Sequence, residues 1–236
     1  MCGRFAQPRS PEELARLFRA TAVSDLDGDR FNVAPTDPVS AVVEHHGERV
    51  LDTFRWGLVP FFADGPKARA PLINARAETV ETSPAFRAAF ARRRCIVPAD
   101  AFYEWRRHRA PATGRVIRSE PFAIRLRNDA PMAFAGLWAI WRDPATAQRL
   151  YSLAIVTGQP NELVATVHDR MPVILHPDDW DAWLDEAARP AELRPLLRPY
   201  PAAELQMYPV SPAVNNVRSQ GAELLLPLSR WSAAAP

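Results

Sequence analysis

Alternation of apolar and polar residues predicts that β-strands dominate this chain. Residues 39–59 read as a hairpin, and further strand-like runs are found at 94–98, 101–105, 122–126, 132–141 and 150–157. Turn residues separate these runs, and neither a repeat nor a clear boundary divides the chain. We therefore expect a single α+β domain over residues 1–236, built mostly from antiparallel sheet.

Short helices are predicted between the strands. Ser10 can cap a helix in which Pro11 takes the first position and Glu13 completes a capping box. Apolar residues at helical spacing follow over 14–18, so one face of this helix should be buried. Other helices are expected to begin at Ser83, Asn161, Pro177 and Pro190.

Charge narrows the ways in which the chain can bind a polyanion. The 236 residues carry a net charge of only +2, so contact with nucleic acid must come from a local patch. Residues 106–120 are rich in arginine and contain a proline, and we interpret them as a basic loop.

The cysteine and lysine content limits the chemistry further. Two cysteines, Cys2 and Cys95, do not form a disulfide framework and favour a reducing compartment. No signal peptide or membrane-spanning run is found, so we expect a cytosolic protein. Lys67 is the one lysine, which leaves two amines for imine chemistry: Lys67 and the chain terminus.

Cys2 follows the initiator Met1 and is small enough for that methionine to be removed. The mature chain would then carry an amine and a thiol on adjacent carbons, and their ordinary pKa values leave both partly deprotonated at neutral pH. An aldehyde can form a Schiff base with the amine, and the thiolate can close a thiazolidine ring in an intramolecular step. The alternative is that Cys2 belongs to a disordered chain terminus without a function.

Two further residues are candidates for proton transfer. Glu104 lies at the end of an apolar strand, where desolvation would raise its pKa, although a glutamate facing water fits the local sequence too. His168 follows a helix-like run and precedes Asp-Arg, a setting that suits a proton shuttle or a histidine that bonds helix carbonyls.

Asn74 and Arg76 alternate along a predicted strand and should share one face. Arg76 could bind a phosphate or pair with a glutamate, and Asn74 could hold an amine or a carbonyl. Trp56, Phe62 and Trp105 are core residues or a stacking surface for bases. The sequence lacks zinc-ligand spacing and a glycine-rich phosphate loop, so we expect neither a metal nor a cofactor.

Eight short motifs occur in order along most of the chain: MCGRF at 1–5, FNVAP at 31–35, WGLVP at 56–60, INARAET at 73–79, RCIVPAD at 94–100, FYEW at 102–105, HDRMP at 168–172 and YPVS at 208–211. Together they resemble the SOS-response-associated peptidase (SRAP) family. The resemblance implies a barrel-like core with peripheral helices. It also implies a monomer in the bacterial cytosol, at the nucleoid, that shields abasic sites in single-stranded DNA.

The resemblance also implies a role for each candidate residue. Cys2 would be the nucleophile of a thiazolidine crosslink, Glu104 and His168 would transfer protons, and Asn74 would position the reacting terminus. The residues that would contact DNA fall into two groups, phosphate ligands and base-packing residues: Arg4 and Arg76, and Pro35, Phe62 and Trp105. Phe62 departs from the family pattern, which more often has tryptophan there.

Two other functions stay open. A cysteine peptidase could use the same Cys2 as its nucleophile, at least to release Met1, so the enzyme could be of lyase or hydrolase type. A non-catalytic single-strand-binding module would need the arginines and aromatic residues without the terminal cysteine.

Overall fold

The computed structural model describes residues 2–23, 26–45, 47–66 and 70–231, and Met1 and Lys67 of the residues considered above lie outside these ranges. The strands are β1 (Phe5–Gln7), β2 (Thr21–Ala22), β3 (Arg30–Val33), β4 (Pro38–His45), β5 (Glu48–Trp56), β6 (Asn74–Arg76), β7 (Arg94–Ala99), β8 (Ala101–Arg109), β9 (Val116–Leu126), β10 (Met132–Arg142), β11 (Arg149–Gly158), β12 (Met171–Pro172) and β13 (Leu205–Pro209). The α-helices are α1 (Pro11–Phe18), α2 (Arg87–Arg92), α3 (Trp180–Leu184), α4 (Pro190–Leu193) and α5 (Leu228–Trp231). The 3₁₀ helices are η1 (Val164–Thr166), η2 (Pro177–Asp179), η3 (Arg194–Leu196), η4 (Ala202–Glu204), η5 (Pro212–Asn215) and η6 (Ala222–Leu225).

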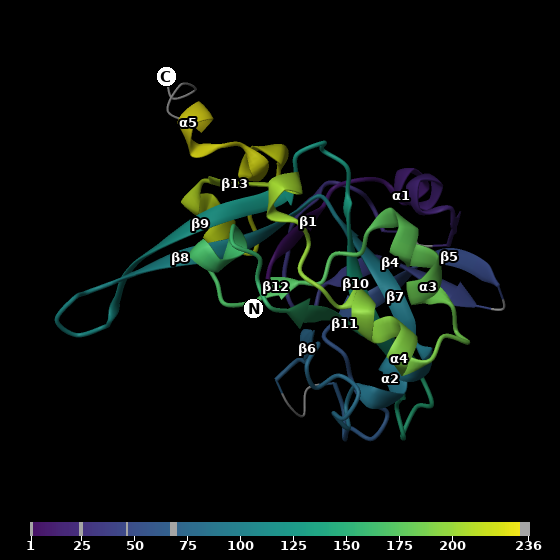
Figure 1. The fold of residues 1–236 in the computed structure, drawn as a ribbon. Coiled ribbons are helices and arrows are strands. Elements are labelled where there is room, and N and C mark those ends of the chain that lie inside the picture. Colours follow the sequence, from purple (N-terminus) through teal and green to yellow (C-terminus); the bar gives the residue numbers. More distant parts are fainter. Residues whose placement is uncertain (1, 24–25, 46, 67–69, 232–236) are drawn as a thin grey trace.

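A closed barrel forms the centre of the molecule and confirms the expected fold class. Antiparallel pairing joins β5, β4, β7, β10 and β11 in that order. A parallel contact between β11 and β5, at Ser152↔Arg55 and Leu153↔Trp56, closes the ring. Closure removes the open edges that a flat sheet would expose. Short helices lie on the outside (Figure 1).

A second sheet has the strand order β13-β9-β8-β1-β3. It is connected to the barrel where β7 continues into β8 through Asp100. Its strand β1 lies between β3 and β8, with Phe5 opposite both Val33 and Phe102. The segment from Cys2 to β1 is thereby fixed where the two sheets meet, and Cys2 lies close to β6 and β12; Figure 1 shows these two strands.

The predicted helix at residue 11 is present as α1. The Ser10 hydroxyl accepts a hydrogen bond from the Glu13 N–H at 3.3 Å, as an N-cap should. Leu14 and Phe18 are buried, which confirms the predicted apolar face. The Glu13 carboxylate pairs with Arg9, so that side chain has another partner.

Residues 106–120 are not the loop that we expected. β8 continues to Arg109 and β9 begins at Val116, so most of the segment is an antiparallel hairpin that extends beyond the barrel (Figure 1). Residues 111–119 are exposed. A two-stranded ribbon with solvent on both faces has no apolar side, and its sequence therefore lacks the alternation that reveals a half-buried strand.

Candidate active site

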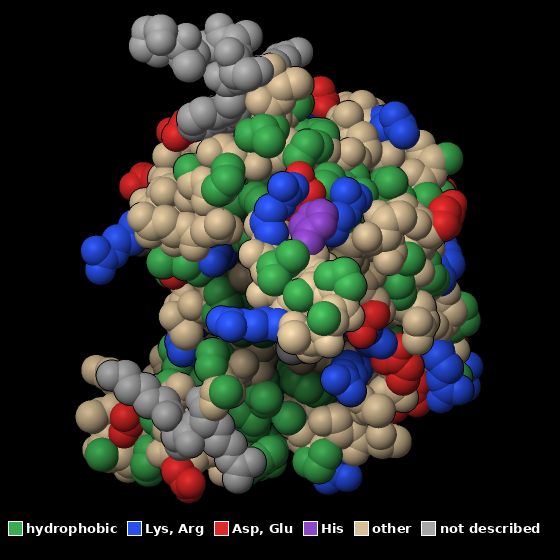
Figure 2. Space-filling view, turned by 90° about the vertical axis from the view of Figure 1, so that its left-hand side faces the viewer, with side chains coloured by type: hydrophobic (Ala, Val, Ile, Leu, Met, Phe, Trp, Pro, Cys, Tyr) green, Lys and Arg blue, Asp and Glu red, His purple; other side chains and the backbone are tan. Residues whose placement is uncertain are grey.

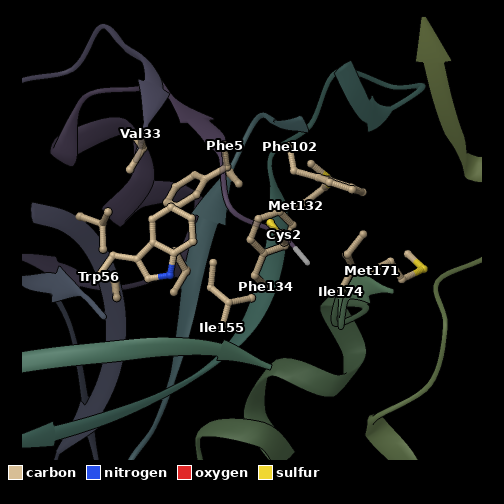
Figure 3. Packing of buried hydrophobic residues seen from close by; sticks show 14 of the residues in the cluster. Cys2, Phe5, Val33, Trp56, Phe102, Met132, Phe134, Ile155, Met171 and Ile174 are labelled. Carbon is tan, nitrogen blue, oxygen red and sulfur yellow. The ribbon is translucent and has the colours of Figure 1, made fainter. Parts of the chain in front are cut away.

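Cys2 lies at the junction of the two sheets. The backbone N–H of Tyr103, on β8, donates to the Arg4 carbonyl at 2.9 Å, which fixes the residues ahead of β1. Cys2 is fully buried in a cluster with Met132, Phe134 and Met171 (Figure 3). Cys2 is thus packed in the core, and the alternative of a disordered terminus at this residue is wrong.

Burial also corrects the expected ionisation of the thiol. Desolvation raises the pKa of Cys2 far above its ordinary value, and the negative charge of Glu104 raises it further. The Arg4 backbone N–H donates to the sulfur and opposes this rise only in part. A partly ionised thiol at neutral pH, which the sequence predicted from reference values, is therefore wrong: the thiol holds its proton until a base accepts it.

Asn74 binds the backbone carbonyl of Cys2. Its Nδ2 donates to the Cys2 carbonyl oxygen at 3.0 Å. β6 carries Asn74 and pairs in parallel with β11, with Asn74 opposite Ile155. The Asn74 Oδ1 is buried, and no partner for it is found among the described residues, so an acceptor stands ready beside the Cys2 backbone.

Glu104 has the properties of a proton carrier. It lies on β8 with 3 % of its surface exposed, so the water-facing alternative is wrong. Burial raises the pKa of this carboxyl group from 4.5 to about 7, with Arg107 among the charges that oppose the rise. Its effect on the pKa of Cys2 places the carboxylate near the thiol. At neutral pH Glu104 can thus both accept and donate a proton.

His168 follows η1 and has two contacts at Nδ1 that require opposite protonation states. The Arg170 N–H donates to Nδ1 at 3.0 Å, which needs an unprotonated nitrogen, whereas Asp169 Oδ1 at 3.0 Å would favour a protonated one. Burial lowers the pKa of His168, and the Asp169 side chain is 89 % exposed, so its pull is screened. The neutral ring, with its proton on Nε2, is favoured at pH 7.

Arg4 is half-buried rather than freely exposed. One of its terminal nitrogens donates to Asn32 Oδ1 at 2.8 Å and to the Val214 carbonyl at 2.9 Å. The guanidinium lies over the Trp105 ring at 5.8 Å, and Trp105 Nε1 donates to Asn215 Oδ1 at 2.7 Å. Burial lowers the pKa of Arg4. Its role as a phosphate ligand stays a prediction.

The remaining predicted DNA contacts lie around this centre on other segments. Arg76 is exposed at the end of β6, and Pro35 is half-buried in the turn after β3. Phe62 is 54 % exposed and lines a cavity of about 350 Å³ together with Leu58 and Pro71. No hydrogen bond or ion pair in the described part of the chain links these three residues to Cys2. Trp56 belongs to the core, at 0 % exposure.

Sequence reasoning missed two residues that shape the site. Asn32 is fully buried on β3 and bonds both Arg4 and three carbonyls of the segment 214–219. A polar residue between apolar neighbours was the available signal. Arg107 acts on both Glu104 and His168 through its charge, and only the pairing of β8 with β9 reveals its position.

Among the described residues, no group of three or more histidine, cysteine, aspartate or glutamate side chains could hold a metal ion. The helices within the same ranges are too short or too polar to cross a membrane.

Comparison with known proteins finds relatives that match nearly the whole chain. It is 38 % identical to the abasic site processing protein YoaM of Bacillus subtilis, covering 95 % of this chain and 97 % of the relative. Identity to YedK of Escherichia coli is 32 %, with 97 % and 100 % of the two chains covered. Identity to HMCES of Gallus gallus is also 32 %, with 97 % and 78 % covered.

Solved structures share the fold. A protein from Bacteroides thetaiotaomicron superposes with a TM-score of 0.85 at 22 % identity, covering 96 % of this chain and 99 % of that one. A phage-related protein from Bordetella bronchiseptica gives 0.69 at 30 % identity, with 89 % and 94 % covered. The profile of the family described as "SOS response associated peptidase (SRAP)" matches residues 1–217. This chain belongs to the SOS-response-associated peptidase family.

Proposed function

We propose that the protein shields abasic sites in single-stranded DNA by forming a covalent thiazolidine through Cys2, once Met1 has been removed. One observation carries this proposal: Asn74 holds the carbonyl of the residue that would begin the mature chain, at 3.0 Å. The charge of Glu104 also acts on the thiol of that residue. The names of the relatives, which call them abasic site processing proteins, support the choice of substrate.

The reaction combines two steps. The Cys2 amine attacks the aldehyde carbon of the opened sugar, and loss of water gives an imine. The sulfur then adds to the imine carbon while the thiol proton ends on the nitrogen. A C–S bond and an N–H bond form, the S–H bond breaks, and the C=N double bond becomes a C–N single bond. Ring closure removes the protonated imine, which would otherwise acidify the neighbouring sugar carbon and lead to strand cleavage by β-elimination.

Glu104 and His168 supply the proton transfers. The pKa of Glu104, about 7, lets the carboxylate accept the thiol proton and return it to nitrogen. Neutral His168 offers its Nε2–H to an oxygen of the sugar during ring opening. The same groups act in reverse when the crosslink is released. Asn74 orients the Cys2 backbone for attack.

We further propose that Arg4 and Arg76 bind phosphates and that Trp105, Phe62 and Pro35 pack against bases. The guanidinium–indole contact between Arg4 and Trp105 offers a charged group beside an aromatic ring. This combination suits a single strand, whose backbone is charged and whose bases stack. Exposure of Arg76 and Phe62 leaves both accessible to DNA.

The test compares Cys2→Ala with Cys95→Ala on an end-labelled oligonucleotide that contains one abasic site. Both cysteines are fully buried, so the second variant controls for loss of a core thiol. Cys2→Ala keeps the amine but cannot close the ring, so we expect the heat-stable adduct to be lost and strand cleavage to appear on a denaturing gel. Cys95→Ala should crosslink as the parent does.

Two results would count against the proposal. A reductant-independent adduct with Cys2→Ala, equal in yield to that of the parent, would show that the thiol does not close a ring. Hydrolysis of an added peptide by the parent, with no adduct on DNA, would favour a cysteine peptidase instead.

A further inference from the structure

The hairpin made by the outer parts of β8 and β9 stands apart from the barrel. Its strands pair from Arg106↔Glu120 to Arg109↔Val116, with a register shift near the tip. Residues 111–119 all belong to the exposed part of the surface. A ribbon that contributes so little to the core needs another reason for its length.

The hairpin concentrates positive charge. Residues 106–120 contain five arginines and a single acidic residue, a net of +4, whereas the whole chain carries +2 and its remainder is therefore net negative. The arginines are Arg106, Arg107, Arg109, Arg115 and Arg118. On the face toward which the hairpin projects, basic side chains gather around a histidine and an acidic side chain, and the surface beside them is hollowed (Figure 2).

Little of this charge is neutralised within the protein. Glu120 is shared by Arg106 at 4.0 Å, His108 at 3.3 Å and Arg118 at 3.2 Å. No ion pair is found in the described ranges for the other hairpin arginines, and the side chain of Arg109 donates to the Gly114 carbonyl at 2.9 Å. The hairpin thus offers guanidinium groups that an anionic partner can bind.

The base of the hairpin adjoins the candidate active site. Glu104 and Phe122 are opposite each other in the register, and Arg106 stacks on Phe122 at 4.4 Å. The charge of Arg107 limits the rise in the pKa of Glu104 and contributes to the lowered pKa of His168. From Glu104 to Arg109 the strand advances roughly 17 Å at about 3.3 Å per residue. A basic track therefore runs from the reacting centre outward.

We propose that this hairpin binds the phosphate backbone of the DNA on one side of the abasic site. The inference rests on the proposed function, since it assumes that DNA enters at Cys2. DNA fits better than an acidic protein because the track begins at the site itself and consists of arginines with one shared carboxylate. The exposed side chain of Ile117 can contact sugars or bases between phosphates.

The test removes charge from the outer hairpin in the variant Arg109→Ala/Arg115→Ala/Arg118→Ala. The matched control, Arg16→Ala/Arg87→Ala/Arg92→Ala, removes equal charge from exposed positions on α1 and α2. A third variant replaces the same three hairpin arginines by lysine and restores the charge. Circular dichroism and the melting temperature show that each variant is folded.

Binding is measured between 50 and 200 mM salt with three single-stranded oligonucleotides, each made with and without the abasic site. The short one has three nucleotides on each side of the central position, and the other two are extended by ten nucleotides, one on the 5′ side and one on the 3′ side. We expect the parent to bind one of the two extended oligonucleotides more tightly than the other. The alanine variant should lose about tenfold in affinity for that oligonucleotide. The slope of the logarithm of its binding constant against the logarithm of the salt concentration should fall in magnitude by roughly two, at ~0.7 per phosphate contact for a single strand.

The short oligonucleotide should crosslink to parent and hairpin variant alike, and the lysine variant should regain the slope. An unchanged salt slope in the alanine variant, or an equal loss in the control variant, would overturn the proposal. Failure of the parent to crosslink any abasic oligonucleotide would refute the proposed function instead. In that case, the affinities of the parent and the alanine variant for the extended DNA without an abasic site would still show whether the hairpin binds DNA.

Discussion

Glu104 combines a proposed role in proton transfer with an effect on the free energy of unfolding. Its pKa is raised from 4.5 to about 7 because burial disfavours the charged carboxylate. The folded protein therefore holds this proton more tightly than the unfolded chain does between these two values. The stabilising effect is complete below pH 4.5 and is lost as the pH rises through about 7. The difference is roughly 3 kcal/mol, from about 1.4 kcal/mol per pKa unit.

We predict that Glu104→Gln weakens this pH dependence. Glutamine keeps the size of the side chain but cannot ionise, so the melting temperature should fall less between pH 5 and pH 8 than in the parent. Above pH 7 the variant should be the more stable protein, while its rate of crosslinking falls. Scanning calorimetry at both pH values measures the effect. Identical pH dependence in the two proteins would mean that Glu104 does not titrate near neutrality.

The motifs predict which residues react, and those roles stay a prediction, whereas the protonation state expected for the thiol disagrees with its burial. The position of Cys2 next to Met1 and the order of the motifs are readable from the chain. Burial of the thiol among Met132 and Phe134, which come from β10, is not. A pKa shift caused by desolvation depends on packing between segments far apart in sequence.

Among the elements, β3 ties the N-terminal segment to the far end of the chain. Asn32 on this strand donates through Nδ2 to carbonyls at 214, 216 and 219, with distances of 3.2, 3.0 and 3.0 Å, and accepts from Arg4 at 2.8 Å. The side chain of Gln220 adds a bond to the Asn32 backbone. This network fixes Arg4 beside the site.

We predict that Asn32→Ala destabilises the protein by roughly 3 kcal/mol, because it leaves buried hydrogen-bonding groups unpaired. The melting temperature should fall by roughly 5–10 °C for a chain of this size. Asn216→Ala is the control, since that side chain is exposed and accepts from the Arg218 N–H, its one side-chain hydrogen bond found among the described residues. Equal melting temperatures for the two variants would show that the Asn32 network carries little stability.

Elements differ in how well their sequence reveals them. The cap at Ser10 and the apolar spacing of 14–18 were enough for α1 because both signals are local. The sequence did not predict the hairpin at 106–120, because neither of its faces is apolar. It also did not predict the parallel pairing of β5 with β11, because nearly a hundred residues separate the two strands. Such pairings follow from closure of the whole barrel.

For the whole molecule, we propose that the chain folds as one cooperative domain. The barrel and the second sheet share one hydrophobic cluster, which contains Cys2, Phe5 and Phe134 (Figure 3). Leu205 of β13 belongs to the same cluster. The calorimetric scans of the parent should accordingly show a single transition. The arrangement places Cys2 inside the core and a basic hairpin outside it. Under the proposed function, the thiol is therefore shielded while DNA binds at the surface.

Intact-protein mass spectrometry, before and after mixing with an abasic single-stranded oligonucleotide, tests the covalent role of Cys2 most directly. We predict loss of Met1 and then a heat-stable adduct that forms without reductant, with the modified peptide beginning at Cys2. A protein that retains Met1 and binds DNA without an adduct would contradict the account and leave only a binding module. So would an adduct that maps to Lys67.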